Sequence, residues 1–490
     1  MVPTLFSLTL FAAAALSFLV QPMVGKHLLP ALGGTPGVWN SCLVFFQAAL
    51  LVGYGLVYGL SRIGFRARLA IHAVMLAGAG GAILFGGRLV PNESWLPTDS
   101  ETPTIAVLAV LAACVGAPYL VLAMTAPLVQ AWYARLGRDP YPLYAASNLG
   151  SFAGLLSYPF LVEPALPLAA QREWWIAAFG IAAVLVLACG ALAIRGRTVA
   201  TGAIANEPGP TCGRILKWIA LAALPSSLLM SATTHITTDI APVPLLWVVP
   251  LGLYLLSFSI VFARWTPAMR RIVGRLTPMA LCFLAVALLT RANTPMILVG
   301  GVHLGAFFLV ALLCHGELAA DRPAPAHLTG FYFWLSTGGV LGGLANAFLA
   351  PWLFAHAGNV EYPLAIVLAG LVRPPSAAVG VRWKTADGIW PFALGALTAL
   401  LVVGVPALLP VQPGTDPDDP LDRLVRGGLS FGLPAAFAFA LVWRPVRFAL
   451  CLAVLLAVGS LAPNPHGTIL ETHRDYFGTL RVARSADGRF

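Results

Sequence analysis

His235 and Asp239 are the two residues whose types and spacing most directly suggest chemistry. They stand four residues apart, so a helical conformation would place them on one face. An imidazole beside a carboxylate could relay protons or hold a cationic amine. Residues 233–239 could equally be a polar connector between two apolar segments, because Pro242 and Pro244 interrupt helical structure nearby.

Lys26 and Glu163 are ionisable residues at the ends of apolar stretches, where a charge is costly if it enters lipid. We expect the long side chain of Lys26 to snorkel to the membrane interface, although it is also a candidate for binding a substrate. Glu163 could bind a cation or lie in water, and it ranks below His235 and Asp239.

His315 and Glu317 follow another apolar stretch, with Asp321 and Arg322 just beyond them. We expect a solvated loop containing a local ion pair, which contributes little to stability. A functional role for His315 and Glu317 is the alternative.

Asn148 and Asn346 are amides beside small residues, and we expect them to bond helix to helix. Residues 338–343 are glycine-rich and are interpreted as a close-packing face, since no Lys-Ser/Thr pair follows to make a phosphate-binding loop. The candidates for substrate binding are His235, Asp239, Lys26, Glu163, Asn148, His315 and Glu317.

The composition indicates which environment must position these side chains. Of 490 residues, 59% are hydrophobic and 10% are charged, whereas soluble domains carry about 25% charged residues. Only lipid can accept so much apolar surface. The net charge of +10 fits basic cytoplasmic loops better than nucleic-acid binding.

No motif of a soluble enzyme or a zinc site occurs in the sequence. GxSxG, HExxH and Walker-type loops are absent, and the seven cysteines are scattered singly. We therefore expect no catalytic residue, no metal and no cofactor in this chain, and whether it serves an enzyme stays open.

Apolar segments about 20 residues long predict membrane-spanning helices. Basic and acidic loops alternate between them, which predicts a cytoplasmic N-terminus and a bacterial inner-membrane location. The first segment lacks a basic leader and is expected to be a retained span. The predicted spans are 4–24, 38–60, 69–90, 104–132, 142–162, 174–195, 215–234, 243–263, 272–290, 295–314 and 328–354, with weaker ones at 360–372, 389–411, 428–443 and 446–462.

The predicted fold is an all-α polytopic membrane protein of about 14 transmembrane helices. A polar linker at 197–214 separates a first six-helix half, 1–196, from a second half, 215–373. This 6+6 division looks like the major facilitator arrangement. Two or three additional C-terminal helices are expected within 374–462.

Residues 463–490 are polar and rich in β-forming residues. Thr479 to Val482 alternates as a strand does, and residues 486–488 give a turn signal. We expect one strand and the turn of a hairpin whose second strand is missing, as if a soluble domain began here.

Several stretches together carry a resemblance to a known family. They are FLVQPMVGK at 18–26, LPALGG at 29–34, VWN at 38–40, FFQ at 45–47, DPYPLYAASNLGS at 139–151, YP at 158–159, EP at 163–164, PSS at 225–227, TTHITTD at 233–239, PLLW at 244–247, CHGEL at 314–318 and GGVLGG at 338–343. The chain resembles bacterial fused proteins in which a facilitator-like membrane region precedes a spermidine synthase-like domain. Residues 476–482 look like the opening strand of that domain. The family's nucleotide-binding turn and its acidic catalytic residue have no counterpart here.

The resemblance implies a membrane module that anchors a polyamine aminopropyltransferase-like domain, in cis or as a separate subunit, or supplies substrate to it. The alternative is a secondary transporter of a small solute such as a cationic amine, with its site between the halves. A structural membrane partner without a ligand is a third hypothesis. Lipid is the expected partner in every case, and nucleic acid in none.

The side of the membrane on which the tail lies follows from the span count. Fifteen spans after a cytoplasmic start would place it outside, whereas a cytoplasmic nucleoside cofactor would require it inside. Residues 360–372 form the shortest segment and could fail to cross, yet Arg373, Arg382 and Lys384 favour crossing because they would then lie inside.

Overall fold

A computed structural model describes residues 2–32, 36–86, 89, 103–196, 208–240, 246–372, 385–409, 425–462, 468–474 and 479–484. The chain forms two compact units. Unit 1 comprises Met1–Ser226, Pro244–Trp265 and His315–Ala347, and unit 2 comprises Ser227–Val243, Thr266–Cys314 and Phe348–Phe490. Most of the linker predicted at 197–214 lies outside the described residues, and the predicted domain boundaries stay predictions.

Ten helices in the described part of the chain are long and apolar enough to cross a membrane. They are Val2–Leu28, Gly37–Leu60, Phe65–Phe85, Ile105–Arg135, Leu168–Arg195, Cys212–Ile240, Pro267–Leu289, Met296–Ala320, Pro325–Leu353 and Asp387–Leu408. Shorter apolar helices are Val248–Ala263, Glu361–Leu371, Val425–Ala440 and Pro445–Gly459. The chain is thus a multi-pass helical membrane protein. The total of about 14 spans and the 6+6 layout stay predictions.

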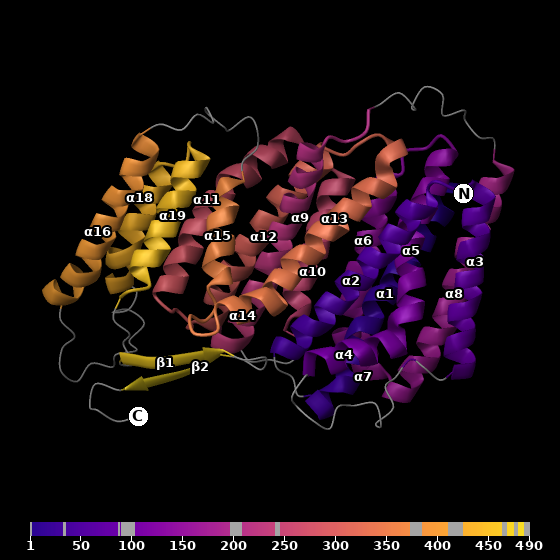
Figure 1. The fold of residues 1–490 in the computed structure, drawn as a ribbon, viewed down its shortest axis with the longest axis horizontal. Coiled ribbons are helices and arrows are strands. Elements are labelled where there is room, and N and C mark those ends of the chain that lie inside the picture. Colours follow the sequence, from indigo (N-terminus) through magenta and orange to yellow (C-terminus); the bar gives the residue numbers. More distant parts are fainter. Residues whose placement is uncertain are drawn as a thin grey trace. The chain divides into compact units, whose positions relative to one another are not determined.

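Unit 1 is built around the long first helix (Figure 1), which packs against α5, α6 and α8, while α2 packs against α5 and α13, and α6 against α10. The helices that lie wholly in this unit are α1 (Val2–Leu32), α2 (Pro36–Leu60), α3 (Phe65–Gly86), α4 (Pro103–Leu111), α5 (Ala117–Arg135), α6 (Tyr141–Ser157), α7 (Glu163–Ala165), α8 (Leu168–Arg195), α10 (Val248–Ala263) and α13 (Leu328–Leu344). π-helical turns η2 (Ala112–Gly116) and η3 (Tyr158–Val162) and the 3₁₀ turn η6 (Pro325–His327) join some of them.

Two glycines set the distance between α1 and α6. A Cβ atom on Gly150 would lie 2.3 Å from the carbonyl oxygen of Phe11, and one on Gly154 would lie 2.2 Å from that of Ala15. No side chain fits there, so the two backbones touch in the manner of a small-xxx-small helix pair. The predicted close-packing role of residues 338–343 holds at Gly338, where a Cβ would lie 2.4 Å from the Ile219 carbonyl oxygen.

Unit 2 contains a second helical group, in which α19 packs against α15 and α16, and α11 packs against α15, α18 and α19. Its elements are η5 (Ile236–Ile240), α11 (Pro267–Leu289), α14 (Ala350–Leu353), α15 (Glu361–Leu371), α16 (Ala386–Leu408), η9 (Gly428–Gly432), α18 (Leu433–Ala440), α19 (Pro445–Gly459), β1 (Thr468–Arg474) and β2 (Thr479–Arg484). Helices α9 (Cys212–His235) and α12 (Met296–Ala320) and the π turn η7 (Ala345–Leu349) contribute residues to both units.

The helices of unit 2 have one arginine-rich end. Asp387 at the start of α16 is almost enclosed and pairs with Arg447 at 2.8 Å and Arg444 at 3.2 Å, both at the start of α19. The opposite end is marked by Gly459 of α19, where a Cβ atom would meet the Leu289 side chain of α11. Helices α11 and α19 therefore run in the same direction, from the arginine-rich end to the opposite end.

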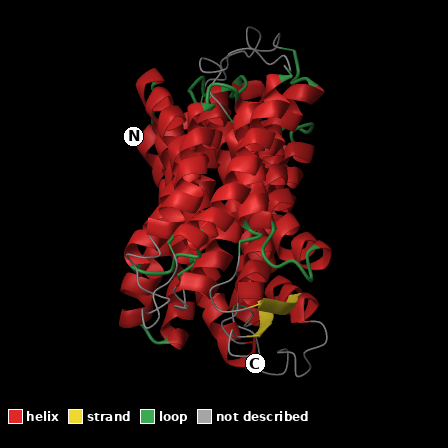
Figure 2. Cartoon of the chain, turned by 90° about the vertical axis from the view of Figure 1, so that its left-hand side faces the viewer, coloured by secondary structure: helices red, strands yellow, loops and turns green. Residues whose placement is uncertain are grey.

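The β-hairpin lies at the opposite end (Figures 1 and 2) and corrects one expectation. The predicted strand at 479–482 is present within β2, but its partner is not missing. β1 precedes it and pairs with it antiparallel, from Thr468 opposite Arg484 to Arg474 opposite Thr479. A register shift between Ile469 and Glu471 interrupts the alternation of side chains along β1. For this reason the alternation of polar and apolar residues did not predict this strand. The predicted turn at 486–488 lies outside the described residues.

Arg474 fastens the hairpin to the helices of unit 2. Its backbone N–H donates to the Ala355 carbonyl at 2.8 Å, and its guanidinium makes a two-pronged contact with Glu361 at 2.7 and 2.9 Å. Both side chains are less than one-tenth exposed. A bidentate pair of this kind defines geometry as well as adding energy. An isolated hairpin is marginal in water, so this attachment explains why the strands are formed.

Candidate functional site

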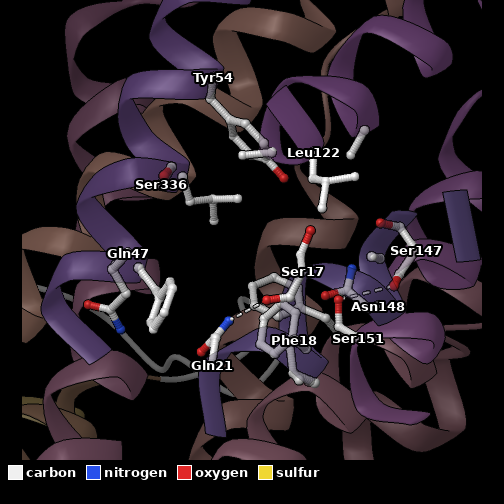
Figure 3. A pocket seen from close by; sticks show the side chains of 18 of the residues that line it. Ser17, Phe18, Gln21, Gln47, Tyr54, Leu122, Ser147, Asn148, Ser151 and Ser336 are labelled. Atoms are coloured by element: carbon white, nitrogen blue, oxygen red, sulfur yellow. Dashed lines mark hydrogen bonds between the residues drawn. The ribbon is translucent and has the colours of Figure 1, made fainter. Parts of the chain in front are cut away.

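Unit 1 contains a partly open cavity of about 140 Å³ (Figure 3). Its wall comes from α1, α2, α5, α6, α10 and α13. None of the lining residues, all of which belong to the described part of the chain, carries a formal charge. The polar and phenolic side chains that line it are Ser17, Gln21, Gln47, Tyr54, Tyr119, Tyr144, Ser147, Asn148, Ser151, Tyr254 and Ser336.

Asn148 is the one sequence-predicted candidate that lines this cavity. Its amide Nδ2 donates to the Tyr144 carbonyl of the same helix at 2.9 Å, and Ser151 donates in the same way to the Ser147 carbonyl at 3.2 Å. The expected bond between helices is thus replaced by one within α6. The glycine contacts of α6 already hold α1 close, so the amide remains on the cavity side (Figure 3). Asn346 likewise donates to the Gly342 carbonyl of its own helix.

Two polar atoms on the cavity wall are left without a partner among the described residues. Gln47 donates its Nε2 to Ser226 at 3.3 Å, and Ser226 donates onward to the Gly339 carbonyl at 2.8 Å, which leaves the Gln47 amide oxygen unpaired. The hydroxyl of Ser336 is also buried and unpaired. Buried polar atoms are nearly always hydrogen-bonded, so these two are available to a bound solute or water.

Aromatic rings form another part of the wall. Tyr144 stacks on Tyr332 with centroids 4.7 Å apart, and it meets Phe258 edge-on at 5.7 Å. Tyr54, also near Tyr332, points its hydroxyl into the open space (Figure 3). A free carboxylate would meet no positive group among these lining residues.

His315 lies behind this wall instead of in a solvated loop, which corrects the sequence-based expectation. α12 continues to Ala320, so His315 is fully buried and Glu317 is nearly so. His315 bonds through Nδ1 to the Ser257 hydroxyl at 2.7 Å and stacks on Phe258 at 3.6 Å. α12 extends beyond its apolar segment, because polar residues at its end such as His315 find partners inside unit 1.

Asp321 corrects the second part of that expectation. Its carboxylate accepts from Arg214, Lys217 and the Trp218 indole, at 3.1, 3.1 and 3.2 Å, so the pairing is long-range and not local. Arg322 lies instead over the ring of Tyr141, with its guanidinium carbon 4.8 Å from the centroid. These contacts belong to the framework and not to the cavity.

Lys26 and Glu163 pair with each other, which the sequence did not suggest. The Lys26 ammonium contacts the Glu163 carboxylate, and both side chains are about one-third exposed or less. α1 continues to Leu32, so Lys26 is inside a helix and not at its end. The pair is apart from the cavity lining, and as a partly exposed ion pair it adds little stability.

His235 and Asp239 belong to unit 2 and share one helical face. α9 passes into the π turn η5 without a break, and His235 Nδ1 lies 2.7 Å from Asp239 Oδ2. Two residues that the sequence did not single out complete the group. His303 lies with its ring 4.6 Å from that of His235, and its Nδ1 is 2.8 Å from the Tyr362 hydroxyl.

The missed residues share a sequence signal. Gln21, Gln47 and His303 are polar residues inside otherwise apolar helices, where each is costly unless it has a partner or a role. The sequence does not show which of these polar residues face the same cavity. The packing of the helices against one another determines which of them lie together.

Comparison with known proteins gives little beyond the helical architecture. No protein-family model matches the chain, and no curated protein sequence matches it. Among solved structures, the chain is similar to the human organic anion transporter MFSD10 (TETRAN), with a TM-score of 0.46 and 15% sequence identity over 75% of this chain and 98% of that one. A likeness of this size assigns the chain neither a family nor a substrate.

Proposed function

We propose that this chain is a secondary transporter whose solute binds in the cavity of unit 1. The observation that carries the proposal is a partly open, uncharged cavity in a multi-pass membrane protein, with unpaired polar atoms at Gln47 and Ser336. A cavity of about 150 Å³ can hold a molecule as large as benzene. The solute is therefore small.

The chemistry of the wall favours an amine over an acid. The free amide oxygen of Gln47 accepts an N–H, and the wall carries no positive side chain that would repel a cation. An anion buried here would lack a counter-charge, which costs several kcal/mol after relaxation. We therefore propose a neutral or monocationic amine as the solute class.

The hairpin of unit 2 bears on the alternative function, a membrane anchor for a synthase-like domain. Basic residues gather at cytoplasmic helix ends in membrane proteins. The arginines near the starts of α11 and α19 are Arg270, Arg271, Arg275, Arg444 and Arg447. The hairpin follows the other end of α19, and Arg291, Arg474, Arg481 and Arg484 lie toward that end. Both ends of these helices carry arginines, so the charge distribution is compatible with a hairpin on either side of the membrane.

The anchor hypothesis is nevertheless supported by one observation, the enclosed Arg474–Glu361 pair that fixes a β-hairpin to the helices. An anchor binds no solute in its own membrane region. It would show no ligand-dependent change in thermal stability, whereas a transporter would.

The test measures binding and exchange of small amines by the purified full chain. Methylamine, benzylamine and tyramine are titrated against the protein in lipid nanodiscs, and exchange is followed in proteoliposomes with the radiolabelled amine. We expect Gln47→Leu to weaken binding about tenfold, because one hydrogen bond to a charged donor contributes about 1.5 kcal/mol or more.

The matched control is Gln171→Leu. Gln171 is buried and hydrogen-bonded to the Leu166 carbonyl, but it does not line the cavity. Its replacement should change affinity less than twofold. An equal loss in both variants, or no binding of any amine by the unmodified protein, would overturn the proposed function.

A further inference from the structure

A second pocket of unit 1 lies at an end of the helices, apart from the solute cavity. It is open to the surface and has a volume of about 320 Å³. The residues that line it are Gly64, Phe65, Arg66, Ala67, Arg135 and Ile194. The first four lie at the start of α3, and the other two lie at the ends of α5 and α8. The pocket shares no lining residue with the solute cavity.

The charge on this wall has one sign. Two of the six lining residues are arginines, and none is acidic. Neither Arg66 nor Arg135 forms an ion pair with another described residue. The guanidinium carbon of Arg135 lies 4.7 Å from the centroid of the Phe65 ring, a contact that holds the side chain beside the pocket without neutralising its charge.

Arg68 adds a third positive charge close by. It is near enough to Arg135 for the two guanidinium groups to repel each other. Its Nε atom is buried and has no hydrogen-bond partner among the described residues. Like charges held together without a counter-charge raise the free energy of the folded state. An anion in the pocket would offset that repulsion.

The start of α3 supplies uncharged donors to the same pocket. The Arg68 N–H donates to the Gly64 carbonyl at 3.1 Å. The amides of the three residues between them, which all line the pocket, have no carbonyl acceptor within the helix. They lie at the positive end of the helix dipole, where phosphate groups bind in many proteins. Guanidinium groups match the oxygens of a phosphate in the same way.

The positive-inside bias alone explains part of this pattern. It accounts for arginines at one end of a group of membrane helices, where water solvates them. It does not require that arginines of two helices line one pocket together with the amides of a helix start. That convergence of donors is the observation that indicates a ligand.

We propose that this pocket binds a phosphate group, either that of an anionic phospholipid or inorganic phosphate. Arg66 and Arg135 supply the charge, and the start of α3 supplies backbone donors. A lipid is favoured because Ile194 in the lining is exposed, as are Ile181 and Val184 of the same helix, so an acyl chain would find apolar surface beside the headgroup. The site is independent of the proposed solute cavity and goes beyond the proposed function.

The test uses the purified full chain in detergent and three probes, phosphatidylglycerol, phosphatidylcholine and inorganic phosphate at constant ionic strength. Native mass spectrometry measures lipid binding, and thermal unfolding measures the effect of each probe. We expect Arg66→Gln and Arg135→Gln each to weaken phosphatidylglycerol binding about tenfold, because each removes a hydrogen-bonding partner of the phosphate that carries a charge. Arg66 is exposed, so its replacement leaves folding intact.

The matched control is Arg271→Gln. Arg271 is an exposed arginine near the start of α11 in unit 2, and its replacement changes the net charge of the chain by the same amount. Its effect on binding should stay below twofold. An equal loss in this variant would overturn the proposal, since net charge alone would then explain the binding.

The three probes distinguish the sources of the phosphate. A rise in Tm with phosphatidylglycerol alone supports the lipid site, and a rise with inorganic phosphate that Arg66→Gln removes supports a site for a soluble anion. Equal binding of phosphatidylglycerol and phosphatidylcholine, together with no effect of inorganic phosphate, would overturn the proposal. None of these outcomes depends on whether the chain binds an amine.

Discussion

The cavity of unit 1 and the histidine series of unit 2, formed by Asp239, His235, His303 and Tyr362, bury polar groups in different ways. The cavity is surrounded by amides, hydroxyls and phenols, with no formal charge on its wall. The series in unit 2 contains a carboxylate and two imidazoles, one partly exposed and one fully buried. A solute in unit 1 would therefore meet neutral contacts, whereas the polar group of unit 2 is built from ionisable side chains.

The largest expected effect concerns the packing on which the cavity depends. Gly154→Leu would force a side chain against the Ala15 carbonyl, where even a Cβ atom lies at 2.2 Å. Because the obstacle is backbone, we expect a loss of about 4 kcal/mol or more in the free energy of unfolding, with loss of amine binding. Thermal unfolding in detergent measures it. Gly180→Leu, at a position with open space, should instead stay within about 1 kcal/mol.

A charge placed in the cavity tests the contrast directly. Ser336→Asp would bury a carboxylate among residues that offer no counter-charge, so we expect a loss of about 3 kcal/mol. Ser336→Ala removes a hydroxyl that has no partner and should change stability by less than about 0.5 kcal/mol. If the aspartate is tolerated as well as the alanine, the cavity is wet enough to hold charge and the contrast between the units fails.

The smallest of these effects concerns the hairpin beside the histidine series. Arg474→Ala leaves the buried Glu361 carboxylate unpaired, and we expect a local loss of about 2 kcal/mol, because the positive end of the α15 dipole at the helix start offsets part of the cost of the unpaired charge. Hydrogen exchange should rise in residues 468–474 and 479–484 while α19 stays protected. Glu471→Ala, an exposed hairpin position, is the control. Equal protection in both variants would show that the pair does not hold the hairpin.

The sequence by itself determined the environment and the helical architecture. Apolar segments about 20 residues long can only be helices in lipid, since every backbone group must be paired within its own segment. The helical spacing of His235 and Asp239 was likewise readable, because residues four apart lie on one face whatever the tertiary fold. The strand at 479–482 was visible from its alternation.

The tertiary structure alone decided which polar residues act together. Lys26 and Glu163 form an ion pair although they are separated by 137 positions. His315, which was expected in a loop, is buried and stacks on Phe258. Within unit 2, His303 and Tyr362 joined His235 from two other helices. The hydropathy of a segment indicates that the segment lies in the membrane, but it does not indicate which residue faces which neighbouring helix. The partner of a buried polar group depends on helix rotation and register, which contacts such as those of Gly150 and Gly154 set.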